Sequence, residues 1–598
     1  MSEVKNRIAK IREQMKKKNI DFYIVCTDDF HGSEYVGDYF KAREYLSGFT
    51  GSSGTLIIGQ KEVLLWTDGR YFLQADEQLK GSEIQLMKMG MEGVDTISEY
   101  LKKNVPHGGC VGYDGRCVTI AFAKEIQNSL KEKEVIFQSE WDLVEEVWTN
   151  RPALSAKPVW ELDCSITGHS RDNDLQKVRE QMKDIGADFF VLTSLDDIAW
   201  LLGLRGNDIL CNPVFLSYLL IGEKEACLYV NSKIISRSIA EKLAKDNITI
   251  KEYNAIYEDL KELSVSDTIL IDETHANERI RQSIPKEMKR INQISPVTLM
   301  KAIKTKEECE HMRIAHLKDG VAVTKFMYWL KNNVGKQEIT EISSAKKLEE
   351  YRKLQEGYLQ PSFDPIIAYA EHGAIVHYSA TKESDKELKS KGLCLADTGG
   401  QYMDGTTDIT RTFALGELTE EEKRAYTLVL MGHINLASAH FMYGTRGVNL
   451  DYIARKPLWE HGLDYNHGTG HGVGFLLNVH EAPNAFRYKL LPQMQYNAVM
   501  EEGMITSNEP GVYIEDKFGV RLENLILCKK AQKTEYGQFM EFETLTLVPF
   551  DLDAVDVSLL SKEQRDWLNK YHERVRNILS EYLDLDERVW LEKATRAI

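Results

Sequence analysis

A duplicated phrase in the first half of the chain constrains the fold more than any other feature of the sequence. Residues 12–25 open with Arg-Glu-Gln-Met, place Asp-Phe six residues after the methionine and continue into a run of β-forming residues; residues 179–192 repeat all three features. Each copy has the pattern of a helix, a short turn and a buried strand, which is typical of the opening of an α/β domain. The repeat therefore predicts two related α/β domains in tandem.

Further signals set the limits of these domains. Strands are expected at 55–58 and 63–66 in the first copy, and at 268–272 in the second. Proline-containing segments at 150–158 and 294–297 have the composition of linkers. A chain of 598 residues has room for about three to four domains. We expect a first domain over 1–155, a second over 156–300 and a third, with a helical extension at its end, over 301–598.

Composition and charge exclude several classes of protein. The formal net charge is −17, which argues against a nucleic-acid surface because such surfaces gather Lys and Arg. The nine cysteines show no Cys-x-x-Cys spacing, so neither a disulfide framework nor a structural zinc module is indicated. The first residues lack the apolar stretch of a secretory signal, and no run of 18 apolar residues offers a membrane span. We expect a cytoplasmic protein.

Beyond residue 300 the pattern changes to helices and glycine-rich hairpins. Helices are expected at 306–329 and 417–441, and the charged tail at 561–598 is expected to be helical, either as a solvated surface or as a dimer helix. Between 377 and 523 the hairpins carry an unusual number of carboxylates and histidines. We therefore expect the chemistry of the protein to lie in this stretch.

The first hairpin carries two aspartates whose predicted register leaves them far apart. An Asp-Gly turn signal places Met403 opposite Thr406, and hence Asp397 opposite Thr412. Asp397 and Asp408 then share a face but lie roughly 13 Å apart, which is too far for one pair of metal ions. Two glycines between them could supply a bulge that shortens the gap, although the spacing alone does not prove it.

The second hairpin brings two glutamates closer. With its turn centred at Lys517, Glu509 faces Leu525, and Glu523 is the diagonal neighbour on the same face at roughly 7–8 Å. Two long carboxylate side chains can converge on a cation from there. A single carboxylate in a hairpin is usually a solvated surface group, so only the ensemble of residues favours a metal site.

A glycine-rich loop lies between the two hairpins. It reads His467-Gly-Thr-Gly-His471-Gly, with His480 further on. So many glycines exclude a helix, so this histidine pair is not the helical zinc pair of metalloproteases. The glycines instead allow the backbone to approach a site closely.

These motifs together resemble the pita-bread metallopeptidases, the group that contains aminopeptidase P, prolidase and methionine aminopeptidase. The matching phrases are Ala374-Ile-Val-His377-Tyr378, Asp397-x10-Asp408-x-Thr410-Arg411-Thr412, His467-Gly-Thr-Gly-His471-Gly, Glu509-Pro-Gly511 and Arg521-x-Glu523-Asn524. With its duplicated N-terminal domains, the whole chain is similar to the long, three-domain form of aminopeptidase P. The resemblance implies an α/β (α+β) architecture: two related creatinase-like domains followed by a pita-bread catalytic domain.

The resemblance also implies a dinuclear metal centre. Asp408 and Glu523 would bridge two divalent ions, Asp397 would complete one ion, and His471 and Glu509 would complete the other. Four hard carboxylates and one imidazole suit manganese better than a metal that prefers thiolates, so we expect two Mn²⁺, with cobalt or zinc as alternatives in vitro.

The same resemblance assigns roles around the metals. Glu509 would act as general base, and His377 and His480 would bind the substrate and stabilise the oxyanion. His467 and Arg521 would line the proline side of the site or support the ligands. Arg70, in the first domain, would contact the peptide, although an ordinary surface arginine is an equal interpretation.

The expected activity is that of a metal-dependent exopeptidase that releases the first residue of short peptides with proline in the second position. A prolidase-type Xaa-Pro dipeptidase is the nearest alternative, but such enzymes usually have one N-terminal domain. Creatinase shares the fold without metals, and a non-catalytic pita-bread binding module is expected to have lost ligands, whereas all five ligand positions are occupied here. Family likeness also suggests a homodimer.

Overall fold

The computed structural model describes residues 2–489 and 497–598, which form two compact units. The first unit comprises Met1–Cys164 and His169–Val297, and the second comprises Ser165–Gly168 and Thr298–Ile598. Both copies of the sequence repeat therefore belong to the first unit. The domain limits at 155 and 300 stay a prediction.

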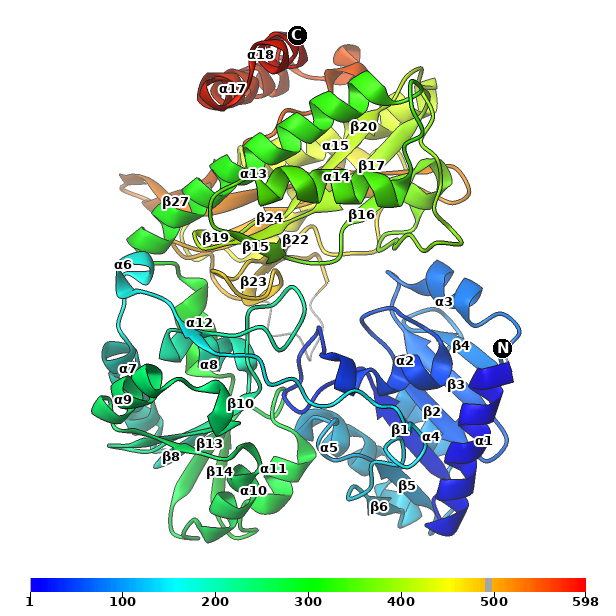
Figure 1. Ribbon diagram of the computed structural model, residues 1–598, viewed down its shortest axis with the longest axis vertical. Coiled ribbons are helices and arrows are strands. Elements are labelled where there is room, and N and C mark those ends of the chain that lie inside the picture. Colours follow the sequence, from blue (N-terminus) through cyan, green and yellow to red (C-terminus); the bar gives the residue numbers. More distant parts are fainter. Residues whose placement is uncertain (1, 490–496) are drawn as a thin grey trace. The chain divides into compact units, whose positions relative to one another are not determined.

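The first unit contains two six-stranded sheets. The first has the order β4-β3-β2-β1-β5-β6, and the second has the order β12-β11-β10-β8-β13-β14 (Figure 1). Their strands are β1 (Phe22–Cys26), β2 (Thr55–Gly59), β3 (Val63–Thr67), β4 (Ile84–Lys88), β5 (Cys110–Tyr113) and β6 (Ile136–Gln138), then β8 (Phe189–Leu192), β10 (Ser217–Ile221), β11 (Ala226–Val230), β12 (Ile248–Lys251), β13 (Thr268–Ile271) and β14 (Lys289–Asn292).

The two sheets repeat one topology. β1 pairs antiparallel with β2 and parallel with β5, and its counterpart β8 pairs antiparallel with β10 and parallel with β13. The strands predicted at 55–58, 63–66 and 268–272 are all present. The predicted duplication of an α/β domain is therefore confirmed.

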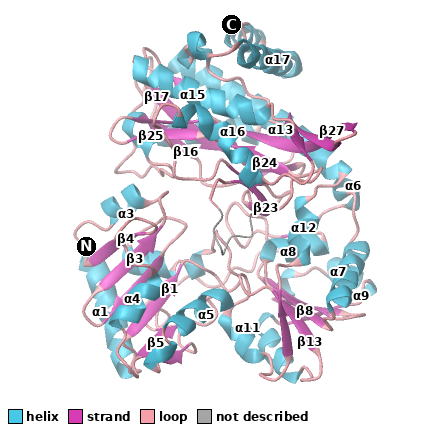
Figure 2. Ribbon diagram, turned by 180° about the vertical axis from the view of Figure 1, so that it is seen from behind, coloured by secondary structure: helices cyan, strands magenta, loops and turns pink. Residues whose placement is uncertain are grey.

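Helices cover both faces of the first sheet because successive side chains of a strand point to opposite sides. Tyr23 and Val25 of β1 pack in one core with α1 (Ser2–Lys17) and α2 (Ala42–Ser47). Phe22 and Ile24 pack in another core with α4 (Ile97–Asn104) and α5 (Ile120–Ser129). Figure 2 shows α1, α4 and α5 around the strands. In the second sheet, the corresponding helices are α7 (Arg171–Ile185), α8 (Leu195–Leu202), α9 (Arg237–Lys245) and α11 (Glu278–Ser283).

The second unit consists of helices packed on short antiparallel sheets. Its sheets have the orders β16-β17-β20, β15-β18-β19, β21-β28-β27-β24-β22-β23 and β25-β26. The strands outside the two site hairpins are β15 (Tyr358–Pro361), β16 (Ile366–Tyr369), β21 (Phe441–Met442), β22 (Gly470–Gly472), β23 (Glu481–Phe486) and β28 (Gly537–Thr544). The helices are α13 (Lys306–Asn333), α14 (Glu341–Lys353), α15 (Glu420–Ala437), α16 (Gly447–Trp459), α17 (Lys562–Leu579) and α18 (Leu585–Ala594).

The predicted helices of this unit are confirmed, with ends set by capping boxes. Thr305 and Glu308 cap the start of α13, and Thr419 and Glu422 cap the start of α15, so each pair satisfies backbone N–H groups that the first turn leaves free. The tail forms α17 and α18, as expected. Within 2–489 and 497–598, no helix combines the length and the apolar character that crossing a bilayer requires.

Candidate metal centre

The first hairpin has a different register from the predicted one. It runs through β17 (Leu393–Thr398), β18 (Gly400–Tyr402), β19 (Gly405–Thr406) and β20 (Ile409–Ala414). Tyr402 pairs with Gly405, and Gln401, not Met403, pairs with Thr406. The turn residues are therefore Met403 and Asp404, one position earlier than the Asp-Gly signal indicates.

This register brings the two aspartates together. Asp397 pairs with Thr410, and the predicted pairing with Thr412 is wrong. Asp408, two residues before Thr410, becomes the diagonal neighbour of Asp397, at a typical distance of roughly 7–8 Å instead of 13 Å. The shift of register shortens the gap that a bulge was invoked to explain.

The register of the second hairpin also differs from the predicted one, by one residue pair. It consists of β24 (Ile505–Asn508), β25 (Gly511–Ile514), β26 (Phe518–Arg521) and β27 (Asn524–Thr534). Asn508 pairs with Asn524, and Gly511 pairs with Arg521. Between these pairs Glu509 lies opposite Glu523, so the predicted pairing with Leu525 is wrong. The two glutamates face each other directly, which strengthens the case for their convergence.

His471 reaches the carboxylates of the two hairpins from β22. It stands between two glycines, and the neighbouring backbone leaves no room for a side chain at either of them. A Cβ atom on Gly470 would lie 1.8 Å from the carbonyl oxygen of Ser507, and one on Gly472 would lie 2.4 Å from that of Glu481. Gly472 also pairs with Thr506 of β24. The segment is a strand, as the exclusion of a helix required, and only glycine allows it to lie so close to β24.

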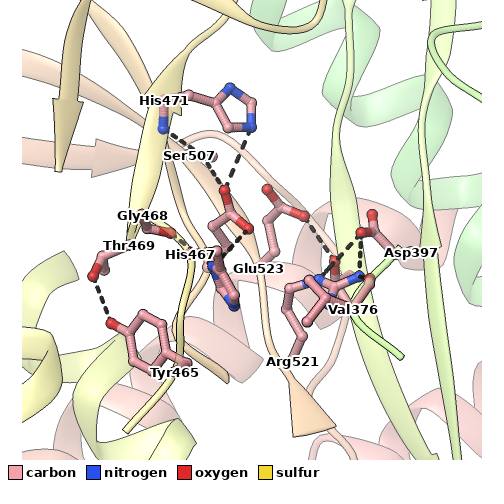
Figure 3. Close-up of polar contacts among 12 residues, drawn as sticks. Val376, Asp397, Tyr465, His467, Gly468, Thr469, His471, Ser507, Arg521 and Glu523 are labelled. Carbon is pink, nitrogen blue, oxygen red and sulfur yellow. Dashed lines mark hydrogen bonds and ion pairs between the residues drawn. The ribbon is translucent and has the colours of Figure 1, made fainter. Parts of the chain in front are cut away.

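The side chains of the two hairpins and of β22 converge (Figure 3). Ligand atoms of Asp408, His471 and Glu523 all lie within 4.8 Å of one another. His471 Nε2 lies 3.5 Å from Asp408 Oδ2 and 3.5 Å from Glu509 Oε1. One oxygen of Asp397 lies 2.6 Å from Arg521 Nη2, and the other is buried without a hydrogen-bond partner in the part of the chain that the structure describes. This arrangement leaves an acceptor for a cation.

Burial of these like charges perturbs their pKa values. Burial, and then the charges of Asp408, Glu509 and Asp397, raise the pKa of Glu523 well above its usual value. Burial also raises the pKa of Glu509. Burial alone would lower the pKa of His471, but Asp408 and Glu509 raise it to about 9. A buried cluster of carboxylates that resists ionisation fits divalent cations, which would neutralise it.

Four hard carboxylates and one imidazole, with no thiolate among them, form a donor set for divalent cations. The residues present therefore fit the two ions that the sequence predicts.

His467 and Arg521 belong to a chain of hydrogen bonds beside this cluster. Arg521 Nη1 donates to the hydroxyl of Tyr513 at 2.6 Å, and that hydroxyl lies 2.8 Å from His467 Nε2. Burial holds the pKa of His467 well below its usual value, so its ring is neutral. With His467 Nδ1 donating to the carbonyl of Gly468, Nε2 accepts from Tyr513. Sequence reasoning missed Tyr513, although it lies four residues after Glu509 and period-2 alternation places both on one face.

The remaining predicted residues are placed as follows. The ring of His480 lies 4.4 Å from that of His471, measured between centroids. His377 directly follows Val376, whose carbonyl accepts from Arg521 at 3.3 Å. Arg70 belongs to the first unit, where it forms ion pairs with Asp68 at 2.9 Å and Glu34 at 3.6 Å. Its contact with a peptide stays a prediction.

Comparison with family models matches four parts of the chain. Residues 310–530 match metallopeptidase family M24, and residues 538–598 match the C-terminal region of peptidase M24. Residues 7–147 and 150–308 each match a creatinase/prolidase N-terminal domain. The expected architecture of two related N-terminal domains and a metallopeptidase domain is thus confirmed.

Individual relatives match over nearly the whole length. The chain is 38% identical to a probable Xaa-Pro aminopeptidase P of Talaromyces marneffei over 99% of this chain and 92% of that protein, and 37% identical to one of Paracoccidioides brasiliensis over 99% of both.

Among solved structures, the X-prolyl aminopeptidase of Caenorhabditis elegans, described as a cytosolic enzyme with a di-nuclear active site, matches with a TM-score of 0.95 and 34% identity over 100% of both chains. The Xaa-Pro dipeptidase of Bacillus anthracis shares the fold over 64% of this chain and 99% of its own, with a TM-score of 0.50 and 23% identity.

Proposed function

The chain belongs to metallopeptidase family M24, and from this premise we propose that it is a dinuclear-metal Xaa-Pro aminopeptidase, which releases the first residue of peptides with proline in the second position. The observation that carries the proposal is the convergence of Asp408, His471 and Glu523 within 4.8 Å, with Glu509 and Asp397 beside them. Full-length similarity to Xaa-Pro aminopeptidases supports the substrate class.

Asp397, Asp408, His471, Glu509 and Glu523 would hold the two metal ions. Bound there, two divalent cations supply Lewis acidity and make water nucleophilic at neutral pH. We propose Mn²⁺ for both, because the donor set is hard.

Glu509 is the general base in this proposal. Ser507 Oγ donates to its Oε1 at 3.3 Å, which fixes the carboxylate beside the ligands. The pKa of Glu509, raised by burial, suits a group that takes a proton from the attacking water and then passes that proton on to the leaving group. The acceptor is the leaving nitrogen of proline, which carries no hydrogen of its own as an amide and must be protonated to depart.

Histidines would bind the rest of the substrate. His480, whose ring lies next to that of His471, and His377 would donate to the oxygen of the scissile carbonyl as it gains charge. Neutral His467 lies 3.8 Å from Glu509, measured from Nδ1 to Oε2, and would line the proline side together with Arg521. Arg70 would also contact the peptide.

The proposal also covers the cellular location and the oligomeric state. We propose a cytoplasmic location, supported by the nine free cysteines and by the cytosolic relative from C. elegans. We also propose a homodimer formed through the catalytic unit. Leu585 and Val589 lie one turn apart on α18 and are 75% and 61% exposed, so they offer an apolar contact surface. Sedimentation equilibrium would test the dimer, and a monomer at micromolar concentration would contradict it.

Peptide hydrolysis tests the function. We expect cleavage of Xaa-Pro-Pro tripeptides, loss of activity with EDTA and recovery with Mn²⁺. Glu523→Gln should abolish activity, whereas Glu515→Gln, an exposed glutamate in the turn of the same hairpin, should leave it unchanged. Activity on Xaa-Pro dipeptides alone would favour the dipeptidase alternative, and a protein that binds no Mn²⁺ would favour a binding module.

A further inference from the structure

The hairpin that carries Asp397 and Asp408 passes from one sheet to another between them. β17 and β20 pair in the sheet with β16, whereas β18 and β19 belong to the sheet with β15. The strand pairs end at Thr398 and Ile409 and begin again at Gln401 and Thr406 in the same register, and within this interruption the Thr407 N–H donates to the carbonyl of Gly400 at 2.9 Å. Asp408 lies in the interruption, outside both strand pairs, where the backbone holds the hairpin less regularly.

A buried ion pair lies at the interruption. Asp319 of α13 is fully buried, and Arg352 of α14 is 3% exposed. Arg352 Nε lies 2.6 Å from Asp319 Oδ1, and Nη2 lies 3.1 Å from Oδ2, so the contact is bidentate. Burial alone would raise the pKa of Asp319, but Arg352 lowers it below its usual value. The pair is therefore ionised.

Each partner of this pair holds one strand of the hairpin. Arg352 Nη2 donates to Thr398 Oγ1 at 3.0 Å, and Thr398 follows Asp397 directly. Thr407 Oγ1 donates to Asp319 Oδ2 at 2.7 Å, and Thr407 directly precedes Asp408. One rigid contact thus connects the residues that adjoin both carboxylates.

The cost of burying such a pair indicates a geometric role. Well-packed apolar residues often stabilise a core as much as a buried ion pair does, or more. A bidentate arginine–carboxylate contact, in contrast, fixes distance and orientation. At the interruption, it adds a fixed geometry to the backbone hydrogen bond between Thr407 and Gly400.

We propose that Asp319 and Arg352 are positioning residues, which set the separation of Asp397 and Asp408 and thereby the affinity for the second metal ion. This inference rests on the proposed function, because it requires the two ions.

The test uses variants that weaken the connection at one of its ends each. Thr407→Val deletes the hydrogen bond to Asp319, together with the one that the hydroxyl accepts from the Gly400 N–H at 2.9 Å, with little change of volume. Arg352→Lys keeps the charge and leaves Thr407 intact but loses the bidentate contact. Thr324→Val on α13 is the matched control: Thr324 is 1% exposed, and its hydroxyl has no hydrogen-bond partner among the described residues. If Arg352→Lys does not fold, Thr407→Val decides alone.

Mn²⁺ binding to the full chain is measured by calorimetry, the coupling of the two ions by low-temperature EPR, and stability by thermal unfolding in EDTA. We expect the second Mn²⁺ to bind about 10–100-fold more weakly to Thr407→Val and Arg352→Lys than to wild type, with loss of the exchange-coupled EPR signal. Thr324→Val should match wild type, and Thr407→Val should unfold in EDTA close to Thr324→Val. Wild-type affinity and spectrum in both test variants would overturn the inference, whereas a wild-type protein that binds no Mn²⁺ would overturn the proposed function itself.

Discussion

Replacement of Glu523 by glutamine should stabilise the protein in EDTA while it removes the stabilisation by metal. Without cations, Glu523 is buried among Asp408, Glu509 and Asp397, which raise its pKa after burial itself. Glutamine keeps the shape of the side chain but carries no charge, so this repulsion disappears. The variant therefore separates the electrostatic cost of the carboxylate cluster from its role as a ligand set.

The magnitude follows from the geometry. At the 4.8 Å that bounds the ligand atoms of Asp408 and Glu523, the repulsion of two unit charges is about 3.5 kcal/mol at an effective dielectric constant of about 20. Because Glu523 can take up a proton instead, the cost of keeping it buried among these charges cannot exceed about 4 kcal/mol at pH 7.5, given the usual glutamate pKa of 4.5. Less perfect hydrogen bonding of the amide to Thr410 costs about 1 kcal/mol. A net gain of about 2–3 kcal/mol remains at pH 7.5.

The dependence of stability on pH shows that the ionised Glu523 destabilises the folded state without metal. A carboxyl whose pKa is raised in the folded state binds more protons when folded, so its ionisation costs stability as the pH rises above 4.5. The gain from Glu523→Gln should therefore shrink to under about 1 kcal/mol at pH 5. Mn²⁺ at about 100 times its dissociation constant should stabilise wild type by about 2.7 kcal/mol per site and should stabilise the variant far less.

Urea unfolding in EDTA and in Mn²⁺, at pH 7.5 and pH 5, measures these effects, with Glu515→Gln as control. The reasoning is refuted if Glu523→Gln in EDTA is no more stable than wild type at pH 7.5. It is also refuted if the gain is the same at pH 5.

Three further predictions concern other parts of the catalytic unit. His480→Ala should lower kcat/KM about 100-fold with both Mn²⁺ still bound in calorimetry, because only a donor to the oxyanion is lost; release of metal would contradict this role. Arg411→Met should lower the free energy of unfolding in urea by at least about 3 kcal/mol, because Arg411 is 1% exposed and donates to the carbonyls of Glu523, Val548 and Pro549; an unchanged midpoint would contradict this. Burial lowers the pKa of His433 to about 3, so below about pH 6.5 only the unfolded chain takes up this proton, and the free energy of unfolding falls by up to about 1.4 kcal/mol per pH unit. His433→Gln should flatten that slope between pH 6.5 and 5 in urea unfolding. Equal slopes in wild type and variant would refute the assignment.

The order of residues along the chain was sufficient for the architecture and for the candidate ligands. The repeat at 12–25 and 179–192 predicts two related domains because identical local patterns favour identical local structures. The helices that begin after Thr305 and Thr419 follow from capping and apolar spacing, which are local properties. The five candidate ligands lie in motifs short enough to be recognised without any long-range contact.

Tertiary contacts decided the registers of the two hairpins, and through them the metal site. The Asp-Gly signal at 404–405 is local, but Asp404 is held by His311 and Lys318 of α13, which favours its place in the turn one position earlier. Gly405 is needed for another reason: a Cβ atom there would lie 2.4 Å from Met312 Sδ. Packing against a helix about 90 residues earlier in the chain therefore outweighs turn propensity and moves Asp397 from opposite Thr412 to opposite Thr410.

The sequence by itself thus determined which residue types and motifs are present, because these are properties of neighbouring residues. Only the tertiary structure decided how far apart their side chains lie. A shift of one residue in a strand pair changes the distance between two carboxylates by several ångströms, and no local signal fixes the register that finely. The links from Asp319 and Arg352 to the hairpin depend on the same long-range packing, so no pattern along the chain indicates them.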